Sequence, residues 1–172
     1  MNAVAKEIRM DTSSTVALYK DMVYGIALTH TNNRVDAEDV FQEVFLTYHR
    51  KQPSFDSAEL RKAWLIVTTI NCAKRVVSGT WQKKVVPLHE DAEHARIDDW
   101  FHFRTDEQDM VFSALQELPT RYKTVLHLFY FEDLSVIQIG TLLDLEVGTV
   151  KVQLSRGRAM MRDRLKGEYF DD

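Results

Sequence analysis

The segment LEVGTVKVQLSRGRAMMRDRLK, Leu145 to Lys166, is the part of the chain that most clearly indicates its fold. At 100° per residue, four apolar or small residues fall within about 60° of Val150, namely Leu154, Gly157, Met161 and Leu165. The opposite face combines basic and small side chains, namely Lys151, Val152, Ser155, Arg156 and Ala159. The pattern predicts a long helix with one buried face and one exposed basic face.

A second, shorter helix is predicted directly before this one. Ser135 and Gln138 form a capping box at the start of SVIQIGTLLDL, and three or four residues separate the two helices. A capped helix, a short turn and a basic second helix is the helix-turn-helix arrangement, in which the second helix enters the DNA major groove. Small side chains flanked by long basic ones allow close approach to base edges while the rim contacts phosphates. The alternative is a surface helix with a solvated basic side.

The charge of the chain is divided into blocks. The formal net charge is −4, yet residues 61–88 carry six basic and no acidic side chains. Residues 89–109 carry eight acidic and two basic side chains. The C-terminal helix supplies a second basic segment. Two separate basic segments can contact a phosphate backbone at two places. A uniformly acidic protein would bind such a polyanion poorly.

Helical periodicity dominates the N-terminal half as well. One helix is expected over Ser14–His30, with Asn32 and Asn33 as its stop. A second is expected from Asp36, as N-cap, to a point before Pro53. A third is expected from Ser57 to Gly79, with one face made by Leu60, Trp64, Val67 and Asn71.

The stretch from Pro87 to Asp109 is acidic and has no clear period, which is typical of a linker. The predicted fold is therefore all-α. It consists of two small helical domains, residues 1–86 and 110–172, joined by an acidic flexible linker over residues 87–109. Beyond the linker, one helix is expected through Val111, Ala114, Leu115 and Leu118, and a new element is expected to start at Pro119.

Composition argues against several classes of protein. The single cysteine, Cys72, excludes an internal disulfide and a Cys-rich zinc site, and is interpreted as a small core residue with a redox role left open. No apolar run reaches the roughly 18 residues of a membrane span, and MNAVAKEIRMDTSS lacks the apolar stretch of a signal peptide. The His and acidic residues near His89 have no metal-ligand spacing. We expect a cytoplasmic protein with no membrane contact of its own, no metal, no cofactor and no enzymatic activity.

Leu118 to Leu165 resembles region 4 of the extracytoplasmic-function (ECF, group IV) sigma factors of RNA polymerase. VGTVKVQLSRGR is similar to the V-G-T-V-K-x-R-L-x-R-[AG]-R of that family, with Gln153 in place of a frequent basic residue and Gly140 in place of a usual alanine. The resemblance implies recognition of the promoter −35 element. The implied contacts are Thr149, Lys151, Val152, Gln153, Ser155, Arg156 and Arg158.

The N-terminal half resembles region 2 of the same family. DAEDVFQEVFLTYHR, Asp36 to Arg50, is similar to the helix that docks on the polymerase clamp, and its acidic-polar side comprises Asp36, Glu38, Asp39, Gln42 and Glu43. AWLIVTTINCAKR and the basic, Trp-containing segment after it are similar to the part that binds the −10 element. The −10 contacts expected there are Arg61, Lys62, Asn71, Lys74, Arg75, Trp81, Lys83 and Lys84. Without the resemblance, the acidic side of Asp36–Arg50 would be read as a solvated face and Trp81 as a hydrophobic lid.

The resemblance covers roughly residues 14–85 and 110–166 and implies an alternative sigma factor. Its implied partners are core RNA polymerase, promoter DNA and an anti-sigma factor. Two other classes stay open from the residues alone. One is a stand-alone helix-turn-helix transcriptional regulator, and the other is a helical adaptor that uses only the acidic face.

Overall fold

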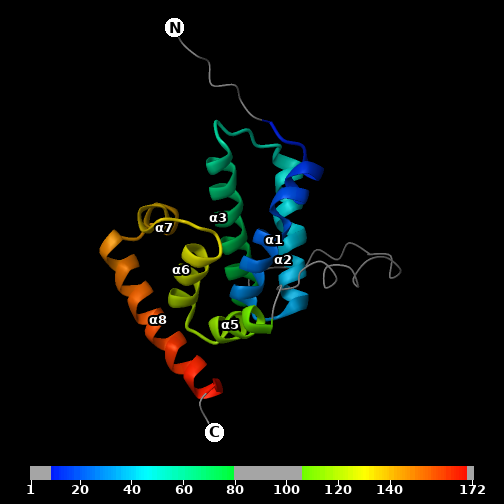
Figure 1. Ribbon diagram of the computed structural model, residues 1–172. Coiled ribbons are helices and arrows are strands. Elements are labelled where there is room, and N and C mark those ends of the chain that lie inside the picture. Colours follow the sequence, from blue (N-terminus) through cyan, green and yellow to red (C-terminus); the bar gives the residue numbers. More distant parts are fainter. Residues whose placement is uncertain (1–8, 80–105, 170–172) are drawn as a thin grey trace.

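The computed structural model describes residues 9–79 and 106–169, and seven α-helices form the regular structure of these ranges (Figure 1). They are arranged in two bundles. The N-terminal bundle contains α1 (Thr12–Thr31), α2 (Arg34–Lys51) and α3 (Ala58–Val77). The C-terminal bundle contains α5 (Asp106–Gln116), α6 (Thr120–Tyr130), α7 (Val136–Leu143) and α8 (Val147–Tyr169). The prediction of an all-α fold is confirmed. Residues 106–109, which were assigned to the linker, belong to α5.

Local capping sets the ends of the N-terminal helices. The Asp11 carboxylate accepts a hydrogen bond from the Ser14 amide at 2.6 Å, and α1 ends at Asn32, whose φ of 53° is left-handed. The predicted stop at Asn32 is therefore confirmed. The N-cap of α2 is Asn33 rather than Asp36, because the Asn33 side chain accepts from the Asp36 amide at 3.2 Å. Asp36 instead lies in the first turn, where its charge suits the helix dipole.

The core of the N-terminal bundle comes from all three helices. Val23, Val40 and Leu65 are fully buried, and the Trp64 ring packs edge-on against Tyr48 with centroids 5.9 Å apart. The expected apolar face of the third helix was wrong, however. Leu60 is 51% exposed and Asn71 is exposed, while Leu65, Ile66, Thr69 and Ile70 point inward. Apolar residues occur on both sides of this helix, so periodicity alone did not determine which side faces the core.

The C-terminal bundle follows the sequence pattern closely. The capping box at α7 is present, with the Gln138 amide donating to Ser135 Oγ at 3.1 Å and the Ser135 amide donating to Gln138 Oε1 at 2.8 Å. Val150 and Leu154 of α8 are buried, as predicted. Gly140 has a specific role at the turn between the two helices. A Cβ on Gly140 would lie 2.8 Å from the Leu145 carbonyl oxygen, so the close approach of α7 to that turn requires glycine.

The two bundles pack against each other, and α6 lies between α1 and α8 (Figure 1). Seven consecutive residues of α6, from Tyr122 to Leu128, are buried. A helix that is buried around its whole circumference sits in the interior of a structure rather than on its surface. Among the described residues, no helix is long and apolar enough to cross a lipid bilayer.

Candidate nucleic-acid interface

One side of α8 forms an exposed surface that we call the reading face, made of Lys151, Val152, Ser155 and Arg156. All four side chains are exposed, and Val152 is 47% exposed. The helix holds them outward because Val150, Leu154 and Gly157 pack inward against the bundle. A row of small side chains between two cations can approach base edges while the cations contact phosphates.

The α6–α8 contact fixes the orientation of this helix. Gly157 lies against α6, and a Cβ at that position would be 2.8 Å from Leu126 Cδ1 and 3.5 Å from Tyr122 Cβ. The two helices can approach this closely only because Gly157 has no side chain. The orientation of the reading face therefore depends on Gly157, which lies on the buried side of α8.

A polar recess adjoins the reading face between the start of α6 and the start of α8. Its lining includes Thr149, Gln153, Arg156 and Arg121. The Gln153 side-chain oxygen is buried and has no hydrogen-bond partner within the described ranges. Arg121 of α6 was not among the contacts expected from the sequence, because only the fold brings it beside the recognition helix.

Arg158 lies at the edge of the reading face, and its side chain is directed toward the end of α6. Its Nε donates to the Tyr130 hydroxyl at 2.6 Å, and its guanidinium carbon lies 5.6 Å from the centres of the Phe129 and Tyr130 rings. It lines an apolar groove between α5, α6 and α8 together with Leu115 and Met161. The structure thus does not bring Arg158 together with the other expected −35 contacts.

The two N-terminal basic residues of α3 are not available on the surface in this arrangement. Arg61 is 1% exposed, and its guanidinium carbon lies 5.6 Å from the centre of the Phe55 ring. Lys62 is partly buried, and its ammonium donates to the Glu132 carbonyl of the C-terminal bundle at 2.7 Å. Burial of Arg61 therefore indicates a structural role for this side chain within the N-terminal bundle.

The C-terminal half of α3 offers the accessible part of the expected −10 surface. Asn71, Lys74 and Arg75 are exposed, and their spacing of three and four residues places them on neighbouring positions of one helix face. Asn71 thus faces outward instead of taking the inward position expected for it. Trp81, Lys83 and Lys84, the other expected contacts, lie outside the described residues.

The acidic side of α2 is accessible. Gln42 is exposed, whereas Asp36, Glu38, Asp39 and Glu43 are partly exposed. Glu43 pairs with Arg50 of the same helix at 3.8 Å. The opposite side packs through Val40, Val44, Phe45 and Tyr48, as expected. One helix thus supplies both a core face and a negatively charged surface.

Cys72 lies in the core and adjoins this acidic side. Burial raises the pKa of its thiol, Arg75 opposes that shift, and Glu43 and Asp39 add to it. A buried thiol with a raised pKa is mostly protonated at neutral pH and is a poor nucleophile. The interpretation of Cys72 as a small core residue is confirmed. The same neighbours show that the acidic side of α2 and the basic end of α3 are close to each other.

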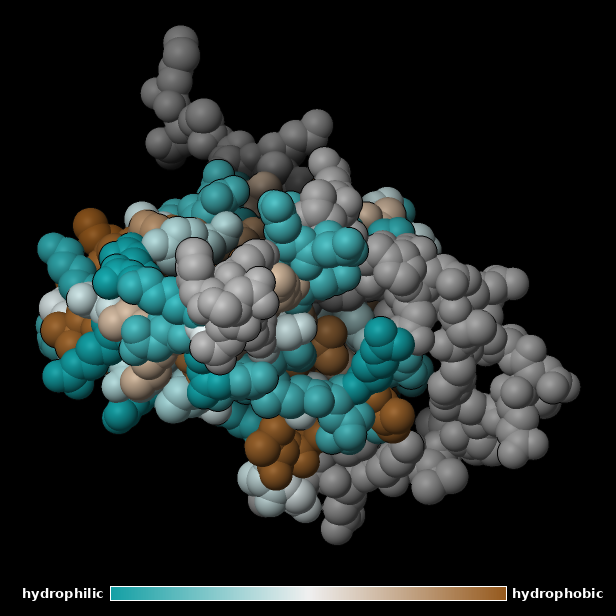
Figure 2. Space-filling view, turned by 60° about the horizontal axis from the view of Figure 1, so that its bottom comes forward, coloured by the Kyte–Doolittle hydropathy of each residue, from teal (hydrophilic) through white to brown (hydrophobic). Residues whose placement is uncertain are grey.

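On the face seen in Figure 2, the described residues are mostly hydrophilic, with separate hydrophobic patches among them. Within residues 9–79 and 106–169, no group of three or more His, Cys, Asp or Glu side chains could hold a metal ion.

Family models match both bundles of the chain. Residues 15–82 match Sigma-70 region 2, and residues 108–161 match Sigma-70 region 4. The two matches fall in the same order as the resemblance found in the sequence. They include α1 to α3 on one side and nearly all of α5 to α8 on the other.

Similar proteins and solved structures agree with these matches. The ECF RNA polymerase sigma factor SigW of Bacillus subtilis is 30% identical over 88% of this chain and 87% of its own length. The ECF RNA polymerase sigma-E factor of Haemophilus influenzae is 31% identical over 88% of this chain and 85% of its own length. The sigma factor RpoE of Bartonella quintana, solved with the anti-sigma factor NepR, superposes with a TM-score of 0.63 at 22% identity, covering 93% of this chain and 98% of that one. This last likeness concerns the fold.

Proposed function

This chain belongs to the extracytoplasmic-function RNA polymerase sigma factors. From that premise we propose which of its surfaces bind the −35 element, the −10 element and core RNA polymerase. It is an alternative sigma factor that directs transcription initiation, and sigma factors are initiation factors rather than enzymes. We assign it to group IV, on the support of its matches to region 2 and region 4 and of its likeness to ECF sigma factors. Residues 1–86 and 106–172 act as the two domains, and the residues between them act as their linker.

The reading face of α8 contacts the −35 element. The observation that supports this assignment best is the exposure of Lys151, Ser155 and Arg156 in a row beside a polar recess, on a helix anchored by Val150 and Leu154. Arg156 reads a base edge, because an arginine guanidinium can donate two hydrogen bonds to the edge of one guanine. Lys151 contacts the backbone.

The exposed half of α3 binds the −10 element. Asn71, Lys74 and Arg75 form its accessible start, and the segment that follows, with Trp81, Lys83 and Lys84, continues it along the chain. Cations attract the phosphates of an unpaired strand, and an aromatic ring stacks on its bases. Arg61 supports this surface from the core.

The acidic side of α2 docks on core RNA polymerase, through Asp36, Glu38, Asp39, Gln42 and Glu43. A surface of carboxylates favours a basic partner surface and speeds its encounter. An anti-sigma factor controls the protein by covering its polymerase-facing surfaces. The sigma factor itself acts in the cytoplasm. The presence of NepR in the solved structure of a similar fold supports this partner class.

The test is transcription in vitro with core RNA polymerase on promoters that differ only at the −35 element. Wild-type protein should give transcripts that depend on both elements. Arg156→Ala should lose discrimination among −35 sequences, a cost of about 1–3 kcal/mol for one lost base contact. Arg162→Ala removes the same charge from the C-terminal part of α8, about 120° around the helix from Arg156, where Arg162 lines the apolar groove, and serves as the matched control. Equal −35 dependence in wild type and Arg156→Ala would refute the assignment.

The docking surface has its own test. Reversing the charge at Asp39 and Glu43 with lysine should weaken binding to core polymerase, measured by fluorescence anisotropy. Reversal at Glu107, an exposed carboxylate of α5, is the control for a general charge effect. Unchanged affinity for core enzyme, with the helical content preserved, would show that the polymerase binds elsewhere.

A further inference from the structure

An apolar groove runs between α5, α6 and α8, on the recognition helix itself. It has a volume of about 550 Å³, and its lining includes the buried side chains of Leu115 and Leu126. Val111 and Tyr130, which also line it, are 37% and 54% exposed. Further apolar lining comes from Phe131, Met161 and Leu165. An accessible apolar surface of this size on a folded chain marks a place where another group binds.

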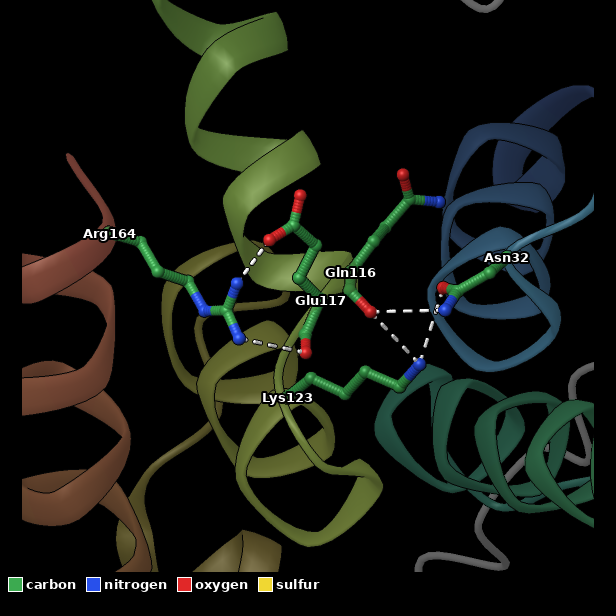
Figure 3. Close-up of polar contacts among 5 residues, drawn as sticks. All are labelled: Asn32, Gln116, Glu117, Lys123 and Arg164. Atoms are coloured by element: carbon green, nitrogen blue, oxygen red, sulfur yellow. Dashed lines mark hydrogen bonds and ion pairs between the residues drawn. The ribbon is translucent and has the colours of Figure 1, made fainter. Parts of the chain in front are cut away.

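The walls of this groove are held in place by contacts at the α5–α6 turn (Figure 3). Arg164 of α8 donates to both the carboxylate and the carbonyl of Glu117, the residue directly after α5. On the other side of the turn, the Lys123 ammonium and the Asn32 side-chain amide donate to the Gln116 carbonyl at 3.4 and 3.1 Å. The end of α5 is therefore fixed to α8 on one side and to α6 and α1 on the other. A preformed groove lowers the entropic cost of binding.

The α8 side of the groove carries a row of basic side chains. Arg158, Arg162 and Lys166 line it, and all three are exposed. Their spacing of four residues places them on one stripe of the helix. Within the part of the chain that the structure describes, Arg162 and Lys166 form no ion pair. The first turn of α5 is instead acidic. The groove thus suits an apolar occupant with negative charge toward α8 and positive charge toward the start of α5.

The segment directly before α5 has this composition. It lies outside the described residues, and its sequence is DDWFHFRT, residues 98–105. Three aromatic residues, Trp100, Phe101 and Phe103, follow two aspartates, and Arg104 comes just before the acidic start of α5. Negative, apolar and positive groups therefore occur along the chain in the order that the groove requires. Trp100 is the largest of the aromatic residues and offers the most apolar surface for burial.

The connection to α5 is long enough for this segment to reach the groove. Val111 and Leu115 lie about 8 Å and about 14 Å from the start of α5 along its axis, at 1.5 Å per residue. Trp100 precedes Asp106 by six residues, which span up to about 20 Å when extended. The segment can therefore fold back along α5 over the part of the groove that this helix lines.

Covalent attachment favours this segment over other occupants. A short flexible connection gives an effective concentration in the millimolar range. A second copy of the chain, or a separate acidic and aromatic peptide, would have to compete from its far lower concentration in solution. A contact of modest intrinsic affinity is therefore formed mostly within one chain.

We propose that the groove between α5, α6 and α8 is the docking site of the chain's own segment 98–104, with Trp100 as its anchor. Docking covers the accessible apolar surface of Val111 and Tyr130 and brings the two aspartates of the segment to the basic row of α8. It extends the C-terminal domain to about residue 98 and shortens the linker accordingly. The docking does not depend on which surfaces bind the promoter or core RNA polymerase.

The experiment is ¹⁹F NMR of the full chain labelled with 5-fluorotryptophan, which places one probe at each of the three tryptophans. The Trp100 signal is identified by its loss in Trp100→Phe. The change in its chemical shift between H₂O and D₂O reports its contact with solvent. We expect a change less than about half of that of free 5-fluorotryptophan, because a docked indole ring has lost most of its contact with water. A change equal to that of the free amino acid would overturn the proposal.

Val111→Glu tests the groove by placing a carboxylate in it, near the aspartates of the segment. Ser113→Glu is the matched control, because it adds the same charge at an exposed position of α5 that does not line the groove. Val111→Glu should raise the isotope shift of Trp100 about twofold, since a carboxylate is unfavourable in an apolar contact. The control should leave it unchanged. Equal effects of the two substitutions, or no effect of Val111→Glu, would refute docking in this groove.

A second groove variant reverses the charge of the basic row at two exposed positions, Arg162→Glu with Lys166→Glu. It keeps the apolar lining and should also raise the isotope shift of Trp100, because it opposes the aspartates of the segment. Circular dichroism checks that each variant keeps the helical content of wild type. An unchanged Trp100 signal in this folded variant would remove the role of charge in the docking.

Two further measurements separate the segment from other occupants. The isotope shift of Trp100 should be the same at about 20 μM and about 500 μM protein, because docking within one chain does not depend on concentration. Protection that is lost on dilution would assign the groove to a second copy instead. A fluorescein-labelled peptide of residues 96–105 should bind about tenfold more tightly when the chain carries Trp100→Ser, Phe101→Ser and Phe103→Ser, since its own segment no longer competes. Equal binding to this variant and to wild type would overturn the proposal.

Discussion

His30 provides a sharp test of the structure through pH. Burial, the largest cause, and the neighbouring Lys123, His127 and Lys74 together lower the pKa of His30 to about 3. Its ring is hydrogen bonded to Thr124 across the interface. The folded chain therefore keeps His30 neutral throughout the mildly acidic range, whereas the unfolded chain takes up a proton below about pH 6.5.

The magnitude follows from linkage. Above pH 6.5 both states hold a neutral ring, so the contribution of His30 to stability is complete. As pH falls below 6.5, only the unfolded state gains the proton, and stability declines by about 1.4 kcal/mol per pH unit until the folded pKa is reached. Between pH 7.5 and pH 5.0 the loss due to this one side chain is about 2 kcal/mol.

The assay compares urea unfolding of wild type and His30→Gln at pH 7.5 and pH 5.0. Trp81 and Trp100 are replaced by phenylalanine in both proteins, so that the fluorescence of Trp64 reports the N-terminal core. Glutamine places an amide near the position of Nε2 and does not titrate. The difference in unfolding free energy between the two pH values should be about 2 kcal/mol larger in wild type than in the variant. If the unfolding free energy changed by the same amount between the two pH values in both proteins, a neutral, buried His30 would be refuted.

Three further changes test the packing. Gly140→Ala should destabilise the C-terminal bundle by about 1–3 kcal/mol, measured by thermal unfolding, because the new Cβ would meet the Leu145 carbonyl oxygen at 2.8 Å; an unchanged melting temperature would contradict that contact. Gly157→Val should cost about 1–3 kcal/mol by overpacking against Leu126 and should reduce −35 recognition as well. Tyr48→Phe should cost about 1 kcal/mol in urea unfolding, because the Tyr48 hydroxyl donates to the Met10 carbonyl at 2.8 Å; retained stability would argue against this bond.

Local rules predicted much of the C-terminal bundle. The capping box at Ser135, the new helix after Pro119 and the buried stripe through Val150 each depend on residues a few positions apart, and all are present. The reading face followed from the same periodicity. Helix α3 was harder, since apolar residues lie on both of its sides, and its expected inward face was wrong at Leu60 and Asn71.

The sequence by itself determined the helices, their caps, the identity of the two halves and the exposed basic face of α8, because these depend on spacing within one segment. Only the tertiary structure decided how the halves meet. It buried Arg61, tied Lys62 to the Glu132 carbonyl, turned Arg158 toward Tyr130 and set Arg121 beside the recognition helix. The pairing of Thr29 with His127 joins positions 98 apart. No local pattern encodes such a pair, because a buried threonine and a buried histidine become partners only when two separately formed bundles bring their surfaces together.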